Sequence, residues 1–319
     1  MRAAVLRAFG EAPRYEDFRD PVAANGEVVV EVCAASLKPV DKQLASGSHY
    51  AAAQALPVIC GIDGVGRLPG GERVFFGGTR APYGAMAERT VVRKAYTFPV
   101  PDALDDRTAA ALPNPGVSAW LSLEYRAKLT SGDNVLILGA TGITGRLAIK
   151  IARLLDAGRI VAAGRNRDVL VALKGEGADA IIPLDGSAQE MTQLFLREAG
   201  EGGFQVVIDY VWGAVAEAFF AAITRNDFAA ITTETRYVQV GESAGANVTL
   251  AAAVLRSTPL TIMGTAGIPP GEVLVSTLQK VMAHAASGKL SIETEQVPLA
   301  DIEAVWQRDS RGRRIVVVP

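Results

Sequence analysis

The sequence contains few residues that could form a disulfide or bind a metal ion. Its 319 residues include only two cysteines, Cys33 and Cys60, and two histidines, His49 and His284. These residues form no Cys-x-x-Cys or His-x-x-x-His pair, and a structural zinc site with four thiolates would need four cysteines. We therefore expect both cysteines to be free thiols in a reducing compartment.

The chain also lacks long apolar runs and an excess of either charge. No run reaches the length of a membrane span, and the apolar start of the chain is too short for a signal peptide. Lys and Arg number 32 against 34 Asp and Glu, so the net charge of −2 gives no case for binding nucleic acid or an anionic membrane. We expect a soluble cytoplasmic protein that is long enough for two domains.

The most informative stretch is residues 135–166, which alternates strand, glycine turn, helix and strand. Residues 135–138 are continuously apolar, as expected of a strand buried on both faces of a parallel sheet. Gly139, Gly142 and Gly145 follow, and without Cβ atoms they allow a sharp turn and a close approach of a pyrophosphate to the helix N-terminus. Glycines in a turn are weak evidence alone, but this strand and helix context favours dinucleotide binding.

The end of the second strand predicts which dinucleotide is bound. An NAD-binding unit usually has Asp or Glu about 20 residues beyond the glycines, to accept hydrogen bonds from the ribose 2′-hydroxyl. Here Arg165 stands in that region, with Asn166 and Arg167 as further donors, and a guanidinium suits a 2′-phosphate. We expect NADP(H), although solvated loop arginines remain the alternative. The dinucleotide-binding residues predicted in the two turns are Gly139, Thr141, Gly142, Ile143, Thr144, Gly145, Gly164, Arg165 and Asn166.

The N-terminal part of the chain is predicted to be an irregular, partly barrel-like β domain. Its short β-branched segments are separated by Gly, Pro or Asn turns, and prolines at 99, 101, 113 and 115 mark its end. The expected strands are residues 1–7, 27–34, 59–68, 73–76 and 88–92.

From residue 118 onward the pattern becomes an alternation of strands and helices, which predicts a doubly wound parallel sheet. A helix is expected around 118–126, and the last strand, 312–318, is expected to rejoin the N-terminal domain. The fold prediction is therefore α/β, with a β-rich catalytic domain (1–116 and 268–319) and an inserted Rossmann domain (117–267). The other expected strands are 180–184, 205–210, 236–241 and 259–264, and the other helices are 168–174, 188–199, 214–224 and 270–286.

Several segments together resemble one family over the whole length of the chain. Residues 35–41 with 46–50, residues 61–66, Leu112-Pro113 with 118–120, and residues 207–209 with Gly213 are similar to segments of the medium-chain dehydrogenase/reductase superfamily. They resemble its zinc-free quinone oxidoreductase branch in particular. The resemblance implies NADPH-dependent reduction of a quinone or an α,β-unsaturated carbonyl by hydride transfer.

The resemblance also implies chemistry without zinc. Lys38 stands where the zinc-dependent alcohol dehydrogenases of the superfamily have a ligand Cys, and Ile62 stands where they have a ligand His. Neither side chain is an ordinary zinc ligand. A conjugated acceptor suits such a site, because conjugation spreads the developing charge and the protein then supplies one or two hydrogen-bond donors.

Four residues are predicted to act at the reacting centre. The ammonium of Lys38 could bind a carbonyl or enolate oxygen, or it could instead form a salt bridge with Asp41, which is expected to hold the loop. Tyr50 matches a pocket-lining position of the branch, with plain aromatic packing as the alternative, and His49 is a weaker candidate proton donor. Ser118 could contact the nicotinamide carboxamide or serve as a helix N-cap.

Further cofactor contacts and an assembly follow from the resemblance. Gly241, Gly264 and Thr265 come after two later strands, and the edge strand 259–264 is expected to pair across a two-fold axis in a homodimer. Two other functions stay open. One is an NADP-dependent alcohol or aldehyde reductase, which needs a strong proton donor, and the other is a non-catalytic NADPH-binding sensor.

Overall fold

The computed structural model describes residues 1–224, 233–265, 269–309 and 312–319. The chain divides into two compact units. One combines Met1–Asn114 with Met282–Pro319, and the other is Pro115–Val281. The second unit is thus inserted between two parts of the first, and each unit is described separately below.

The inserted unit is built on a parallel sheet. Within the described residues the sheet has six strands in the order β11-β10-β9-β12-β13-β14, and every neighbouring pair is parallel. This is the strand order of a doubly wound dinucleotide-binding sheet, with the switch between β9 and β12. The six strands are β9 (Asn134–Leu138), β10 (Arg159–Gly164), β11 (Ala180–Pro183), β12 (Val206–Asp209), β13 (Thr235–Gln239) and β14 (Leu260–Gly264).

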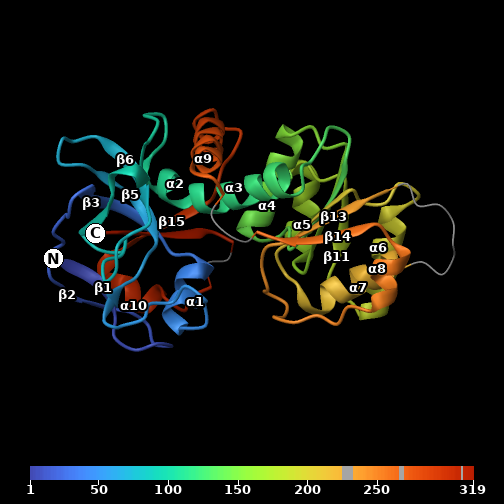
Figure 1. Cartoon of the computed structure of the whole chain (residues 1–319), viewed down its shortest axis with the longest axis horizontal. Helices are drawn as coiled ribbons and strands as arrows, with labels where there is room; N and C mark the ends of the chain where they lie inside the picture. Colours follow the sequence, from blue (N-terminus) through green and yellow to red (C-terminus); the bar gives the residue numbers. More distant parts are fainter. Residues whose placement is uncertain (225–232, 266–268, 310–311) are drawn as a thin grey trace. The chain divides into compact units, whose positions relative to one another are not determined.

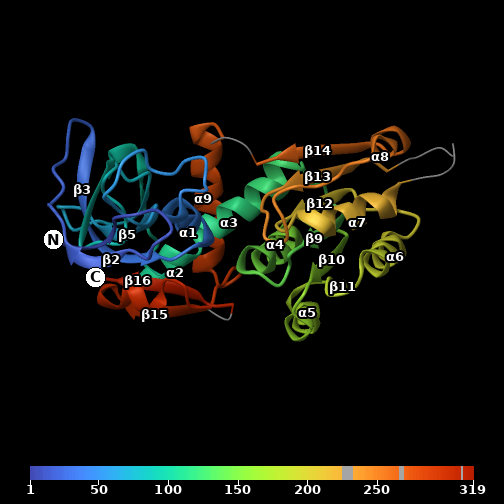
Figure 2. The same cartoon turned by 90° about the horizontal axis from the view of Figure 1, so that it is seen from below.

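Helices cover both faces of this sheet. Figure 2 shows the strands in order from β14 to β11, with α4 and α5 on one side and α6 and α7 on the other. Apolar side chains of the strands and of α6 and α7 form one buried cluster around Phe195, Phe219 and Tyr237. The helices of this unit are α3 (Pro113–Trp120), α4 (Ile143–Leu154), α5 (Arg167–Leu173), α6 (Ala188–Ala199), α7 (Gly213–Ile223), α8 (Ala252–Ser257) and most of α9 (Gly271–Ala286), with a π-helical segment at Leu121–Arg126.

The other unit contains two sheets. The smaller has the order β2-β1-β4, and the larger has the order β15-β16-β3-β5-β6-β8, with β7 also paired to β3. Figure 1 shows β15 (red) in the same unit as the N-terminal strands (blue). Its neighbour, the C-terminal strand β16, pairs antiparallel with β3. The strands are β1 (Arg2–Leu6), β2 (Arg14–Asp17), β3 (Glu27–Ser36), β4 (Val58–Ile59), β5 (Asp63–Arg67), β6 (Arg73–Gly77), β7 (Arg89–Arg93), β8 (Thr97–Pro99), β15 (Thr294–Pro298) and β16 (Arg314–Val318), and the helices are α1 (Pro39–Ser46), α2 (Asp106–Ala111) and α10 (Ile302–Val305).

These observations confirm the predicted fold class. The βα alternation, the edge position of β14 and the return of the last strand to the first unit all agree with the sequence. The units meet after Asn114 and after Val281, whereas the sequence placed these boundaries after 116 and after 267. The second boundary differs because α9 packs within the inserted unit, where Lys280 pairs with Glu124 at 2.7 Å.

Two local predictions were wrong. The single strand expected at 59–68 is split into β4 and β5, because Gly61 turns the chain with φ +95° and a Cβ there would lie 2.9 Å from the Met86 amide nitrogen. The helix expected around 118–126 begins earlier, at Pro113, and continues as the π-helical segment. Prolines fit the first turn of a helix, so Pro113 and Pro115 lie inside the start of α3 rather than before it.

Candidate functional site

The glycine turn joins β9 to α4 at the carboxyl edge of the parallel sheet. Gly139 has φ +84°, and a Cβ there would lie 2.9 Å from Cγ1 of Val211. A Cβ at Gly145 would lie 2.4 Å from the carbonyl oxygen of Gly139, whereas at Gly142 the nearest atom would be 3.4 Å away. Two of the three glycines are therefore required by the fold itself, and Gly142 leaves the turn open to solvent.

The N-terminus of α4 is available to an anion. Gly142 is its N-cap, and the first turn contains Ile143, Thr144 and Gly145 without an acidic residue. Free backbone amides and the positive end of the helix dipole favour a phosphate at such a position. Thr141 packs against the end of β10, because a Cβ at Gly164 would lie 2.5 Å from its methyl group.

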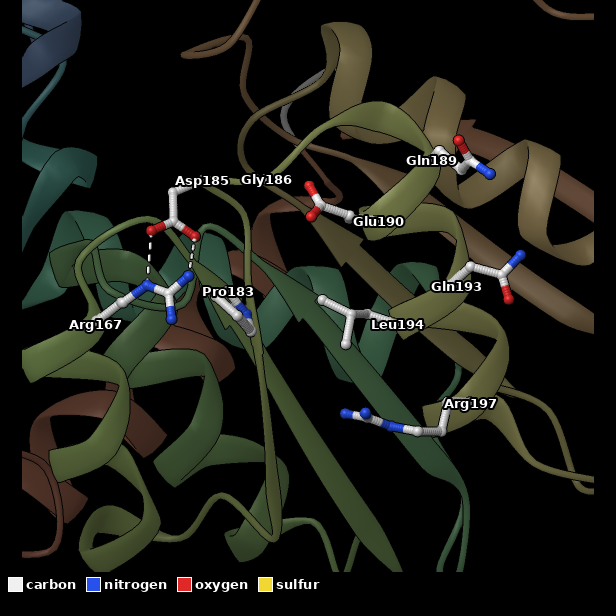
Figure 3. Close-up of a pocket in the computed structure, with 9 residues that line it drawn as sticks. All are labelled: Arg167, Pro183, Asp185, Gly186, Gln189, Glu190, Gln193, Leu194 and Arg197. Atoms are coloured by element: carbon white, nitrogen blue, oxygen red, sulfur yellow. Dashed lines mark hydrogen bonds and ion pairs between the residues drawn. The ribbon is translucent and has the colours of Figure 1, made fainter.

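The end of β10 carries the three side chains that were predicted to select the cofactor. Arg165 is exposed, and among the described residues its guanidinium forms no hydrogen bond or ion pair. Asn166 instead caps α5 by accepting a hydrogen bond from the Val169 amide at 3.1 Å. Arg167 makes a two-pronged ion pair with Asp185 at 2.7 and 2.9 Å (Figure 3). Arg165 is thus the cation of this group that remains free for a ligand.

The ion pair of Arg167 and Asp185 borders a groove of about 610 Å³. Hydrogen bonding to Arg167 lowers the pKa of the Asp185 carboxyl, so this carboxylate stays ionised. Figure 3 shows Gln193, Leu194 and Arg197 along α6 on the other side of the groove. These side chains lie outside the residues predicted from the sequence.

A second pocket contains two predicted residues from distant parts of the chain. Ser118 of α3 and Thr265, the residue after β14, line a cavity of about 190 Å³ together with residues of the π-helical segment. Ser118 lies inside α3, and its carbonyl oxygen accepts a hydrogen bond from Ser122 at 2.8 Å. The alternative role of Ser118 as a helix N-cap is therefore wrong, and its contact with nicotinamide stays a prediction.

The ends of β12, β13 and β14 lie beside one another in the sheet (Figure 2). Gly264 ends β14, and Gly241 follows β13, where a Cβ would lie 2.7 Å from the Tyr210 carbonyl oxygen. Asp209 ends β12 and is fully buried. Its burial raises the pKa of the carboxyl, while hydrogen bonds from Tyr237 and two backbone amides oppose this shift.

Lys38 is buried in the other unit, inside a cluster of charges. Its ammonium lies 2.8 Å from Oδ1 of Asp63, 3.2 Å from Oδ2 of Asp41 and 2.8 Å from the Ser36 carbonyl oxygen. Burial lowers the pKa of Lys38, but the carboxylates of Asp41 and Asp63 outweigh this effect and raise it. Arg314 of β16 is also buried and donates to the Leu37 carbonyl oxygen at 3.0 Å.

This cluster favours the alternative that the sequence left open for Lys38, a salt bridge with Asp41. The side chain is 1% exposed, and the three donors of its ammonium face three acceptor groups. Asp41 also accepts a hydrogen bond from the Lys38 backbone amide at 2.8 Å, which holds the start of α1 as expected. A direct role of Lys38 or Asp41 toward substrate stays a prediction.

Tyr50 and His49 lie in a different environment. Tyr50 is 96% exposed, and its ring stacks on that of His49 with centroids 4.2 Å apart and planes at 30°. The exposed pair offers a flat aromatic surface, while plain packing in a core is ruled out for Tyr50 by its exposure. Whether this surface meets a ligand stays a prediction.

The described residues lack two kinds of feature. No group of three or more His, Cys, Asp or Glu side chains among them is arranged to hold a metal ion. In the same part of the chain, none of the helices combines the length and the apolar content that a membrane span requires.

Known proteins resemble this chain in sequence and in fold, although no family model matches it. A probable NADPH-dependent quinone reductase of Emericella nidulans is 30% identical over 230 residues, which cover 68% of this chain and 63% of that protein. A 2-methylene-furan-3-one reductase of Solanum lycopersicum is 31% identical over 51% of this chain and 46% of that protein. The chain thus spans less than two thirds of the length of either relative. A solved structure, an NAD-dependent alcohol dehydrogenase, superposes with a TM-score of 0.84 at 26% identity, covering 100% of both chains.

Proposed function

We infer that this chain, which belongs to the medium-chain dehydrogenase/reductase superfamily and is of the quinone oxidoreductase type, is an NADPH-dependent oxidoreductase. It reduces a quinone or an α,β-unsaturated carbonyl by hydride transfer. The observation that carries this inference is the free guanidinium of Arg165 beside the open glycine turn. A carboxylate at that position would repel a 2′-phosphate, and a guanidinium attracts one.

The residues at the carboxyl edge fit an NADPH molecule. The N-terminus of α4 would hold the pyrophosphate, and Arg165 would hold the 2′-phosphate. Gly139, Gly164 and Gly241 keep the chain compact at this edge, because a Cβ at each would lie within 3.0 Å of another protein atom. Ser118 and Thr265, which line one cavity, would contact the nicotinamide end. Bound NADPH supplies the hydride, and these residues orient it.

The protein supplies no strong acid to the acceptor in this proposal. The ammonium of Lys38 is committed to Asp41, Asp63 and Ser36, so Lys38 and Asp41 hold the loop that begins α1. The exposed rings of Tyr50 and His49 offer a stacking surface for a planar substrate. Quinones and enones suit this arrangement, since conjugation spreads the charge that the hydride leaves and no zinc ion is needed.

The proposal includes an assembly and a compartment. β14 is the edge strand of the parallel sheet, and its partly buried residues Leu260, Ile262 and Met263 are suited to pairing with a second copy in a homodimer. Free Cys33 and Cys60 fit a reducing cytoplasm. The partner molecules are NADPH and a small carbonyl or quinone substrate, without nucleic acid or membrane.

The test is the loss of nicotinamide absorbance when NADPH is mixed with the protein and a panel of quinones and enones. We expect turnover with at least one of these classes and a preference for NADPH over NADH. No turnover with either class would count against the proposal. The resemblance to the NAD-dependent alcohol dehydrogenase favours one second candidate, a carbonyl reductase, so aldehydes belong in the same panel.

A further inference from the structure

The residues that follow β12 combine a buried carboxylate, a strained backbone and an unpaired buried hydroxyl. The buried carboxylate of Asp209 accepts hydrogen bonds from the amides of Val211 and Trp212 at 2.7 and 2.9 Å. Trp212 has φ +57° and ψ −156°, a backbone conformation that is common only for glycine. The hydroxyl of Tyr210 is buried and has no hydrogen-bond partner among the described residues. Strained backbone conformations cluster at active sites and ligand clamps, and an unpaired buried polar group calls for an explanation.

Tyr210 lies between two glycines that were predicted to approach the cofactor. A Cβ at Gly139 would be 3.2 Å from the Cβ of Tyr210, and a Cβ at Gly241 would be 2.7 Å from its carbonyl oxygen. Burial raises the pKa of the Tyr210 phenol, so at neutral pH it is protonated and can donate a hydrogen bond. Tyr210, which directly follows β12 at the carboxyl edge of the parallel sheet, therefore carries an unused donor.

Neighbouring groups do not use this donor. The Asp209 carboxylate is already filled, with Oδ1 facing two backbone amides and Oδ2 accepting from the Tyr237 hydroxyl at 2.5 Å. The Ser243 hydroxyl donates to the Tyr210 carbonyl oxygen at 3.2 Å, so this hydrogen bond holds the backbone and does not involve the phenol. A buried donor without an acceptor destabilises the free protein, and a ligand oxygen would remove that penalty.

The strand that carries Tyr210 indicates which half of a dinucleotide it would meet. A doubly wound sheet consists of two mononucleotide-binding halves that meet at the switch point. β9, β10 and β11 form one half, in which Arg165 follows β10 and is expected to meet the adenosine 2′-phosphate. β12, β13 and β14 form the other half, and Tyr210 follows the first of these strands.

We propose that Tyr210 is a cofactor-binding residue whose phenol donates a hydrogen bond to an oxygen of the nicotinamide mononucleotide half of NADPH. This assignment rests on the proposed function. Sequence reasoning missed Tyr210, although its position directly after Asp209 on the strand beside β9 was a usable signal.

The test is the substitution Tyr210→Phe in the full chain, which removes one oxygen and keeps the ring. Without substrate present, titration by fluorescence or calorimetry should show about tenfold weaker NADPH binding, equivalent to about 1.4 kcal/mol. Binding of 2′,5′-ADP, which lacks the nicotinamide half, should be unchanged. The Tm of the ligand-free variant should not fall, because the lost hydroxyl had no partner.

Tyr83→Phe is the matched control in the other unit. The Tyr83 hydroxyl donates to the Asp20 carbonyl oxygen at 3.1 Å, so its loss should lower the Tm and leave NADPH binding unchanged. Equal NADPH affinity of the wild type and Tyr210→Phe would overturn the role of Tyr210 and leave the proposed function standing. A fall in Tm as large as that of Tyr83→Phe would overturn the role of Tyr210 too. Absence of NADPH binding by the wild-type chain would overturn the proposed function as well.

Discussion

The two cations singled out in the sequence, Arg165 and Lys38, end in opposite environments. Arg165 directly follows β10, where it is exposed and unpaired among the described residues. Lys38 is buried, and two carboxylates surround its ammonium. A charge beside a glycine turn is free to meet a ligand, whereas a charge inside a core is already used by the fold.

The difference is also one of construction. The turn at the carboxyl edge of the parallel sheet depends on glycines. Close packing around Gly139 and Gly145 leaves no room for a Cβ at either position. The Lys38 cluster is shaped by side chains from β3, α1, β5 and β16, which come from distant parts of the sequence. Replacing Arg165 should therefore affect binding, whereas replacing Lys38 should affect folding.

The largest expected effect is that of Lys38→Met. This change leaves the carboxylates of Asp41 and Asp63 buried without their cation, which should cost about 3–5 kcal/mol in the free energy of unfolding. Denaturant unfolding followed by circular dichroism measures it. Lys94→Met, at an exposed lysine, is the control and should stay within about 0.5 kcal/mol of the wild type. A Lys38→Met protein as stable as that control would mean that the cluster is not a structural ion pair.

A smaller effect is expected when a Cβ is forced into the glycine turn by Gly145→Ala. The new methyl would lie 2.4 Å from the Gly139 carbonyl oxygen, and such overpacking should cost about 1–3 kcal/mol. Gly142→Ala is the matched control, because its nearest neighbour would be 3.4 Å away and its φ of −78° suits alanine. Thermal unfolding of both variants measures the difference. Equal Tm values would contradict the packing role of Gly145.

The sequence predicted the inserted unit well because its signals are local. Buried strands appear as apolar runs, and a residue that follows such a run, such as Arg165, must lie at the sheet edge. The partners of Lys38 could not be predicted in the same way. Asp63 reaches Lys38 only because the turn at Gly61 starts a new strand, and this depends on packing against Met86.

Other features were missed for different reasons. Helix α1 was overlooked although Pro39 at its first turn and Gly47 at its end are ordinary helix signals. The unpaired hydroxyl of Tyr210 is a property of its three-dimensional surroundings, since an absent partner leaves no trace in the sequence. The sequence could therefore place a residue at a strand end, whereas the partners of its side chain depend on neighbours from elsewhere in the chain.

Arg165→Met tests the free cation at the edge of the sheet. Loss of one charged contact to the 2′-phosphate should weaken NADPH binding about tenfold, equivalent to about 1.4 kcal/mol, and leave NADH binding and Tm unchanged. Arg167→Met is the control, because its guanidinium is held by Asp185 and its loss should alter neither affinity by as much. Fluorescence titration with both cofactors measures the selectivity. If Arg167→Met changed it more than Arg165→Met, the assignment of the two arginines would be reversed.

The smallest expected effect is the change with pH in the contribution of Lys38 to the free energy of unfolding. The carboxylates raise the pKa of Lys38 above its ordinary value of 10.5, so the folded state holds this proton more tightly than the unfolded chain does. The stabilisation is then fully present below about pH 10.5 and is lost as the pH rises through the folded-state pKa. The difference in free energy of unfolding between the wild type and Lys38→Met should accordingly stay constant from pH 7 to about pH 10 and narrow above that range. Urea unfolding at each pH measures it, and a difference that widened at alkaline pH would show that the buried amine is not held as an ammonium ion.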